Sequence, residues 1–239
     1  WEEVWDTGIG TNANFQKGVG SSTNISWTSP SVANTTIQVA YAPDNDGAQN
    51  NNKSVSGATS DSFGSGWDLV LDINKGGAIN MFLGASETEQ TDQSKSDSNL
   101  QDLGGDHQEG VVGLQFAFGP VELGGQISAE RLRTQSRNDT SYYANSSWGL
   151  AFNINDDLSV SYSQARHLQT KTKKAATDTG RTEAQSPKSW MRGDSIQVAY
   201  TVGGLGLKYA ATDYDNVAYG FDSAATPRKV QLVALSLAF

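Results

Sequence analysis

The last stretch of the chain, from Lys229 to Phe239, alternates between two kinds of side chain. A period of two is that of a β-strand, whose successive side chains point to opposite faces of the sheet. One face of this stretch is small and more polar, and the other is wholly apolar: Val233, Leu235, Leu237 and Phe239. A soluble sheet rarely buries its most apolar strand at a fraying chain end. The last strand of a membrane barrel pairs with a neighbour and presents apolar side chains to hydrocarbon, so we expect a transmembrane barrel.

The composition permits a barrel but does not by itself select one. The 239 residues carry a net charge of -9, 25 glycines and no cysteine, and no apolar run is long enough for a membrane-spanning helix. The same values suit an acidic soluble protein, because only alternate residues of a barrel strand meet lipid. The absence of cysteine excludes a disulfide scaffold and a thiolate metal site.

Alternating segments recur along the whole chain, and we expect all of them to be strands, with no helix. The eleven predicted strands lie within residues 24–30, 35–43, 67–74, 79–85, 112–118, 121–130, 142–154, 158–162, 196–202, 205–211 and 229–239.

The connections between these segments are alternately short and long. Up-and-down membrane barrels have this pattern, with short turns on the periplasmic side and long loops outside. We therefore expect an all-β, transmembrane, up-and-down antiparallel β-barrel with its short turns at one end, and aromatic residues near the strand ends. The alternative is a soluble β-sandwich with one buried face. The predicted short turns are Pro30 to Asn34, Lys75 to Gly77, Gly119-Pro120, Asp156-Asp157 and Gly203-Gly204.

Three features together resemble the trimeric general porins of Gram-negative outer membranes, which have sixteen strands. They are the terminal Phe239, the Ser29-Pro30 turn, and the segment Tyr41 to Asp44 (YAPD) that leaves the second predicted strand. In that family five strands precede a constriction loop and eleven follow it. The resemblance implies that residues 1–22 are the constriction-loop-like segment, that residues 23–239 form barrel strands, and that the first five strands are absent. The chain begins at Trp1 without Met, so we expect a processed or truncated product. A complete twelve-stranded barrel, with an extra strand within Gly8 to Gly20, is the alternative.

The resemblance also implies a function, a passive channel for small hydrophilic solutes and ions in a homotrimer embedded in outer-membrane lipid. In porins the constriction loop supplies carboxylates opposite a basic wall, and the matching residues here are Glu2, Glu3 and Asp6. A transverse field in a narrow, low-dielectric passage biases ion flow. The basic wall comes mostly from the earlier strands in that family, so it is not found in this sequence.

The alternation itself assigns further residues to the lumen, on the face opposite the apolar one. The carboxylates in this set outnumber the one lysine, which favours cations modestly; the alternative is that each is a solvated group with little individual influence. The predicted lining residues are Asp68, Asp72, Glu122, Gln126, Glu130 and Lys208. Only two aromatic residues, Phe82 and Tyr143, are expected to point inward, which is too few for the aromatic row of a sugar-selective channel.

Other chemistry is weakly represented. His107, which we expect in a loop, and His167, at a predicted strand end, have no nucleophile or acid at a specifying spacing, so we expect no enzyme, although an outer-membrane hydrolase stays formally open. Asp44 to Gly47 resembles the start of a calcium loop without its closing acid, and we expect a plain turn. We expect no cofactor; the porin resemblance implies at most weak calcium binding.

The remaining partners follow from the surface and from the resemblance. A basic gap from Gln169 to Gly193 is suited to contact lipopolysaccharide, or is simply a solvated loop; its charges are Lys171, Lys173, Lys174, Arg181, Lys188 and Arg192. We expect no nucleic-acid partner. The alternatives to a general channel are a solute-specific barrel, and a non-channel barrel that acts as an adhesin or anchor.

Overall fold

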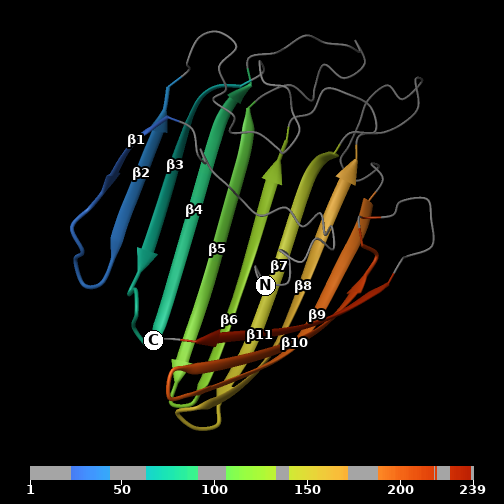
Figure 1. Ribbon diagram of the computed structural model, residues 1–239. Coiled ribbons are helices and arrows are strands. Elements are labelled where there is room, and N and C mark those ends of the chain that lie inside the picture. Colours follow the sequence, from blue (N-terminus) through green and yellow to red (C-terminus); the bar gives the residue numbers. More distant parts are fainter. Residues whose placement is uncertain are drawn as a thin grey trace.

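The computed structural model describes residues 23–43, 63–90, 106–132, 140–171, 188–217, 219 and 227–237. These residues form one antiparallel sheet in which each strand pairs with the next along the chain (Figure 1). The strands are β1 (Ile25–Thr28), β2 (Thr36–Ala42), β3 (Phe63–Ile73), β4 (Ile79–Gln90), β5 (His107–Phe118), β6 (Val121–Arg131), β7 (Thr140–Asn153), β8 (Leu158–Lys171), β9 (Lys188–Val202), β10 (Leu205–Asp215) and β11 (Arg228–Leu237).

The predicted eleven up-and-down strands are confirmed, and the sandwich alternative is wrong, because the described strands form a single sheet and not two. Within the described residues no pairing joins β1 to β11, so the sheet has two edges. The same residues contain no helix long and apolar enough to cross a membrane.

The five predicted short turns all lie at one end of the sheet, at the bottom of Figure 1. Their residues suit the tight reversals. Gly119 has a φ of 56° and Asn74 a φ of 56°, a left-handed conformation that glycine and asparagine adopt more readily than other residues. In the turn before β8, the Asn155 side-chain oxygen accepts hydrogen bonds from the backbone N–H groups of Asp157 and Leu158, both at 2.9 Å. Local sequence therefore sets these reversals.

The strands extend further at the opposite end than the sequence predicts. The basic gap predicted to be loop from Gln169 to Gly193 is strand at both of its ends, so that Lys171 lies in β8 and both Lys188 and Arg192 lie in β9. The physical reason is that neither strand face is consistently apolar here, because Trp190 and Met191, on opposite faces, stand among polar residues. A period of two is visible in sequence only where one face is apolar, whereas the backbone ladder continues without that contrast.

The burial of the sheet is reversed relative to a soluble domain. Its outward positions are apolar and exposed; Trp148 is 44% exposed and Leu235 is 65% exposed. The opposite face is mainly polar; His167 near its upper end is only 1% exposed, whereas Glu122 and Lys208 further down are exposed. The register joins the apolar positions across neighbouring strands, as in the row Phe116, Leu123 and Leu150 on β5, β6 and β7. The result is a continuous apolar belt on one face.

The polar face is the concave one. The sheet curls so that β10 and β11 come round in front of the preceding strands (Figure 1). Tyr219, which follows β10, contacts Tyr143 on β7 with ring centroids 6.0 Å apart. Because β8 and β9 lie between these two residues in the sheet, the side chains can meet only on the face toward which the sheet curls. The polar side chains on this face therefore line the inside of the curve.

Candidate functional site

All six residues predicted to line a lumen belong to this concave wall. The register places Asp68, Glu109 and Glu130 in one row across the sheet through Ser86. Glu122 on β6 pairs with Ala151 on β7. The next inward residue on β7 is Asn153, which pairs with Ser159 on β8. The other three predicted residues lie on the same face. Their cross-strand partners there are Phe82 for Asp72, Gly113 for Gln126 and Ala199 for Lys208.

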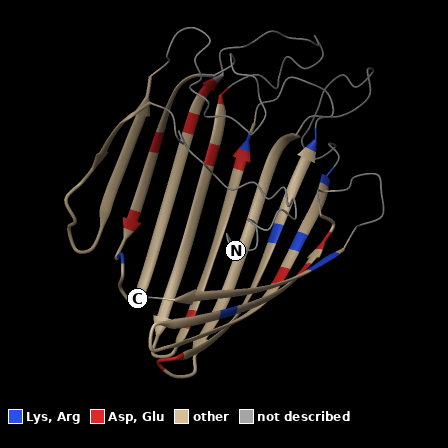
Figure 2. Ribbon diagram, viewed as in Figure 1, with Lys and Arg blue, Asp and Glu red and all other residues tan. Residues whose placement is uncertain are grey.

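Charge is unevenly distributed over the wall. Figure 2 shows acidic residues on β3 to β6 and again on β9 and β10, and basic residues mainly on the later strands. On the concave face, Asp68 and Asp72 come from β3, Glu122 and Glu130 from β6, and Lys208 from β10. Glu122 and Lys208 are exposed, whereas Glu130 is buried. The arrangement places the single predicted lysine on a different part of the curve from the carboxylates.

The middle of the wall is a shallow groove lined by small side chains. The floor is formed by Gly124, Gly149, Ala151, Ser161 and Ser163, and larger side chains surround it, namely Phe82, Gln115, Glu122, Gln126 and Gln197. Glycine, alanine and serine leave space above the sheet that larger residues would fill. The floor of the groove is therefore open.

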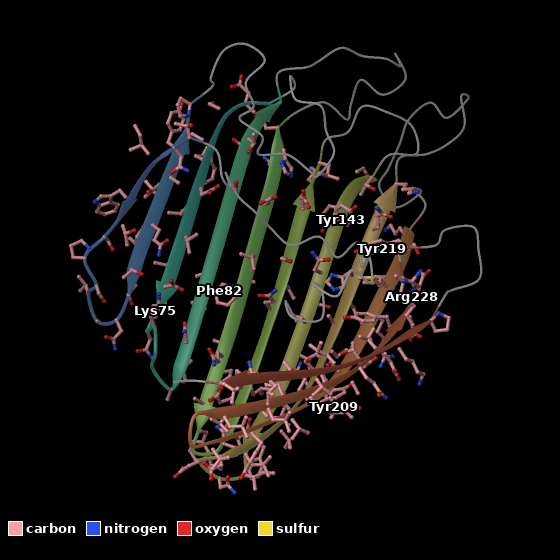
Figure 3. All side chains as sticks on the ribbon, in the orientation of Figure 1. Lys75, Phe82, Tyr143, Tyr209, Tyr219 and Arg228 are labelled. Atoms are coloured by element: carbon pink, nitrogen blue, oxygen red, sulfur yellow. The ribbon has the colours of Figure 1, made fainter. Side chains whose placement is uncertain are left out.

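Phe82 fits closely over a glycine on the neighbouring strand. A Cβ atom added at Gly113 would collide with the Phe82 ring. The ring therefore lies across the β4 and β5 backbones and does not project far from the wall. Figure 3 labels Phe82 on this part of the sheet.

A short segment after β10 packs onto the wall. Asn216 donates from Nδ2 to Ser189 Oγ at 2.8 Å and to the Trp190 carbonyl oxygen at 2.6 Å. Tyr219 is buried against Tyr143 and Met191 (Figure 3). The predicted loop from Thr212 to Pro227 thus begins as strand, up to Asp215, and then turns inward. The strand pattern could not indicate this, because no alternation marks the segment.

The prediction that only two aromatic residues point inward is therefore wrong. Tyr214, beyond the predicted end of its strand, pairs with Gly193 and is 1% exposed on the same face as Lys208. Its ring packs in a cluster with Val217 and Val230. The additional aromatic residues are packed against other side chains and do not form an open row of ring faces.

Both histidines lie in strands, which corrects the sequence expectation for His107. It is the first residue of β5, and its Nε2 atom is 2.9 Å from Glu130 Oε1 and 3.7 Å from Glu109 Oε1. His167 lies inside β8, where its Nδ1 atom is 2.8 Å from Asn145 Oδ1. Sequence spacing missed the acid beside His107 because Glu130 comes from the next strand, and register decides which residues meet.

The apolar belt ends in an ordered polar row on the convex face. Asp194 Oδ1 accepts hydrogen bonds from the Tyr162 hydroxyl at 2.6 Å and from Gln164 Nε2 at 2.8 Å. Arg192 Nε is 2.8 Å from Asp194 Oδ2. Below this row, the rings of Trp148 and Tyr162 meet edge to face, with centroids 5.4 Å apart. Aromatic side chains with polar tips thus mark the edge of the belt, as the sequence predicts in general terms.

Several predicted sites lie outside the described residues. They are the constriction carboxylates Glu2, Glu3 and Asp6, the calcium-like turn from Asp44 to Gly47, the basic residues Lys173, Lys174 and Arg181, and the terminal Phe239.

Comparison with known proteins gives a likeness in structure only. No protein-family model matches the chain, and no curated protein matches it in sequence. The fold is similar to that of the outer membrane channel DcaP of Acinetobacter baumannii, with a TM-score of 0.59 and 14% sequence identity. The match covers 89% of this chain and 61% of that one, so the chain spans less than two thirds of that channel. The likeness is one of fold: an all-β, up-and-down antiparallel sheet of consecutive strands.

Proposed function

We propose that the protein is an outer-membrane porin that conducts small hydrophilic solutes and ions by passive diffusion, and that it is not an enzyme. The reversed burial carries this proposal, because an apolar convex face has a favourable environment in hydrocarbon and a polar concave face has one in water. The fold shared with an outer membrane channel supports it. The short turns would then lie on the periplasmic side of a Gram-negative outer membrane.

The dimensions of the belt agree with this environment. On β6 the outward positions are uncharged from Val121 to Ala129, and Arg131 follows. At about 3.3 Å per residue this run is roughly 26 Å long. A tilt of about 40° reduces it to roughly 20 Å, close to the apolar band of an outer-membrane barrel.

A general channel fits the wall better than a solute-specific one. The groove floor is made of small side chains, and the inward tyrosines are packed in clusters. A wall with few projecting groups discriminates chiefly by size. The non-channel alternative, an adhesin or anchor, requires a plugged lumen.

Liposome swelling tests this choice. With the full-length protein in vesicles, we expect swelling rates to fall smoothly from mono- to tri- and tetrasaccharides and to stay proportional to solute concentration. A rate that saturates for one sugar class would favour the solute-specific barrel, and no swelling above protein-free vesicles would favour the anchor.

We further propose that residues 1–22 form a constriction loop, that five strands precede it in a sixteen-stranded barrel, and that three such barrels form a trimer in contact with lipid and lipopolysaccharide. The porin resemblance of the sequence supports these points. In this arrangement Glu2, Glu3 and Asp6 face the narrowest part of the channel, where their field acts on every passing ion.

The reversal potential in a salt gradient tests the constriction. Neutralising Glu2, Glu3 and Asp6 together in the full-length protein should shift it toward anion preference. Neutralising Asp44 and Asp46, which we place in an external loop, should shift it much less, because salt screens exposed charges beyond about 10 Å at 0.1 M. A larger shift from the Asp44 and Asp46 change would contradict both the constriction assignment and the strand count.

A further inference from the structure

Three side chains at the outer end of the concave wall converge on one point. His107 and Glu109 lie two residues apart on β5 and therefore share a face, and Glu130 lies directly opposite Glu109 on β6. Their candidate ligand atoms all lie within 4.8 Å of one another. The three side chains are 4%, 6% and 3% exposed, respectively. Register and burial thus produce a compact group of one imidazole and two carboxylates.

This arrangement has an electrostatic cost. Like charges directly opposite each other on neighbouring strands destabilise a sheet, and burial of a carboxylate is costly unless its oxygens are paired. Glu130 Oε1 lies beside His107, but Glu130 Oε2 is buried and has no hydrogen-bond partner. A buried carboxyl oxygen without a hydrogen-bond partner calls for an explanation, and a ligand site is one.

We propose that His107, Glu109 and Glu130 bind a divalent transition-metal ion of the zinc type. Two ligand atoms about 2.1 Å from a tetrahedral zinc ion are about 3.4 Å apart. The distances from His107 Nε2 to the two carboxylates, 2.9 Å to Glu130 and 3.7 Å to Glu109, bracket this value. Small side-chain adjustments therefore suffice to seat the ion, and its charge offsets the facing carboxylates.

The ligand types select the class of metal. Calcium and magnesium prefer oxygen ligands, whereas imidazole nitrogen with carboxylate oxygen suits zinc and its neighbours in the first transition row. The site therefore differs from the weak calcium binding that the porin resemblance implies. Three protein ligands leave one tetrahedral position for water or for another ligand.

Zinc titration of the full-length, metal-stripped protein in detergent micelles tests the site. By isothermal calorimetry we expect saturable zinc binding that magnesium at the same concentration does not displace. Glu130→Gln and Glu109→Gln should each weaken that binding at least tenfold, because even indirect partners of a metal ligand change affinity by 10- to 100-fold. Glu122→Gln is the matched control, since it neutralises a carboxylate on the same strand and face outside the cluster, and it should leave the affinity unchanged.

Fold loss and site loss are separable. Heat-modifiable gel mobility identifies any variant that fails to form the barrel. If a glutamate variant fails, zinc binding is measured on His107→Gln in its place. Cobalt binding supplies a second readout, because visible absorption bands from a tetrahedral site should appear in the unaltered protein and be lost in the variants. Absence of saturable zinc binding, or equal affinity in folded variants that lack His107, Glu109 or Glu130, would overturn the proposal. Neither readout requires conduction, so the proposal and the channel function can fail separately.

Discussion

Leu114→Arg is expected to reduce the folded barrel sharply, whereas Gln115→Arg on the next residue should not. Leu114 lies in the middle of the apolar belt on β5, is 37% exposed, and pairs with Met81 and Gly125. An arginine on the lipid face costs about 2 to 4 kcal/mol near the midplane of the bilayer. Gln115 pairs with Asn80 and Gly124, and therefore points to the opposite, concave face.

Urea titration of the protein folded into lipid vesicles provides the measurement. We expect Leu114→Arg to lower the free energy of unfolding by about 2 to 4 kcal/mol, and Gln115→Arg to change it by less than about 1 kcal/mol, because the new charge is solvated. The pair is matched in strand, depth and introduced residue. Similar losses in both variants would show that the apolar face does not meet lipid, and a larger loss at Gln115 would reverse the assignment of the two faces.

The sequence predicts the belt well because each strand contrasts an apolar face with a polar one. The alternation of Trp148, Leu150 and Phe152 identifies β7, and the terminal apolar residues identify β11, without knowledge of what these strands contact. The short turns are equally local, since Gly119 and Asn155 supply their own reversals. Residue patterns alone therefore predict the fold class and the face of the sheet on which each of these side chains lies.

The outer ends of the strands were not accessible in this way. Above the belt neither face is consistently apolar, so the sequence predicts loop at residues such as Gln169 and Lys188, although they continue the ladders of β8 and β9. The inward turn after β10 depends on hydrogen bonds from Asn216 to a different strand. Contacts of this kind arise from tertiary structure and leave no periodic signal in the sequence.

The cluster around His107 illustrates why a site formed by two strands is hard to predict from sequence. The alternation of side chains predicts that Glu130 points inward, but its contact with His107 depends on the register between β5 and β6. A shift of that pairing by one residue would place the two side chains on opposite faces. One sequence predicts the face on which a strand residue lies, whereas its partner on the neighbouring strand is known only once the register is known.

The groove also permits a direct test of what the concave face encloses. Ser161 lines the groove on β8, and Val160 beside it points to the belt, where it pairs with Phe152 and Val198. The chain has no cysteine, so Ser161→Cys and Val160→Cys each introduce a single reactive thiol. A thiolate in water reacts with a charged reagent, whereas a thiol in hydrocarbon is neither ionised nor reached.

Single-channel recording in a planar bilayer, before and after addition of a bulky cationic thiol reagent, is the most direct measurement of a water-filled channel. For the full-length protein we expect stepwise conductance, a smaller step after modification of Ser161→Cys, and an unchanged step for Val160→Cys. Absence of stepwise conductance in the unaltered protein, or a reduction confined to Val160→Cys, would contradict the assignment of the concave face to a water-filled channel.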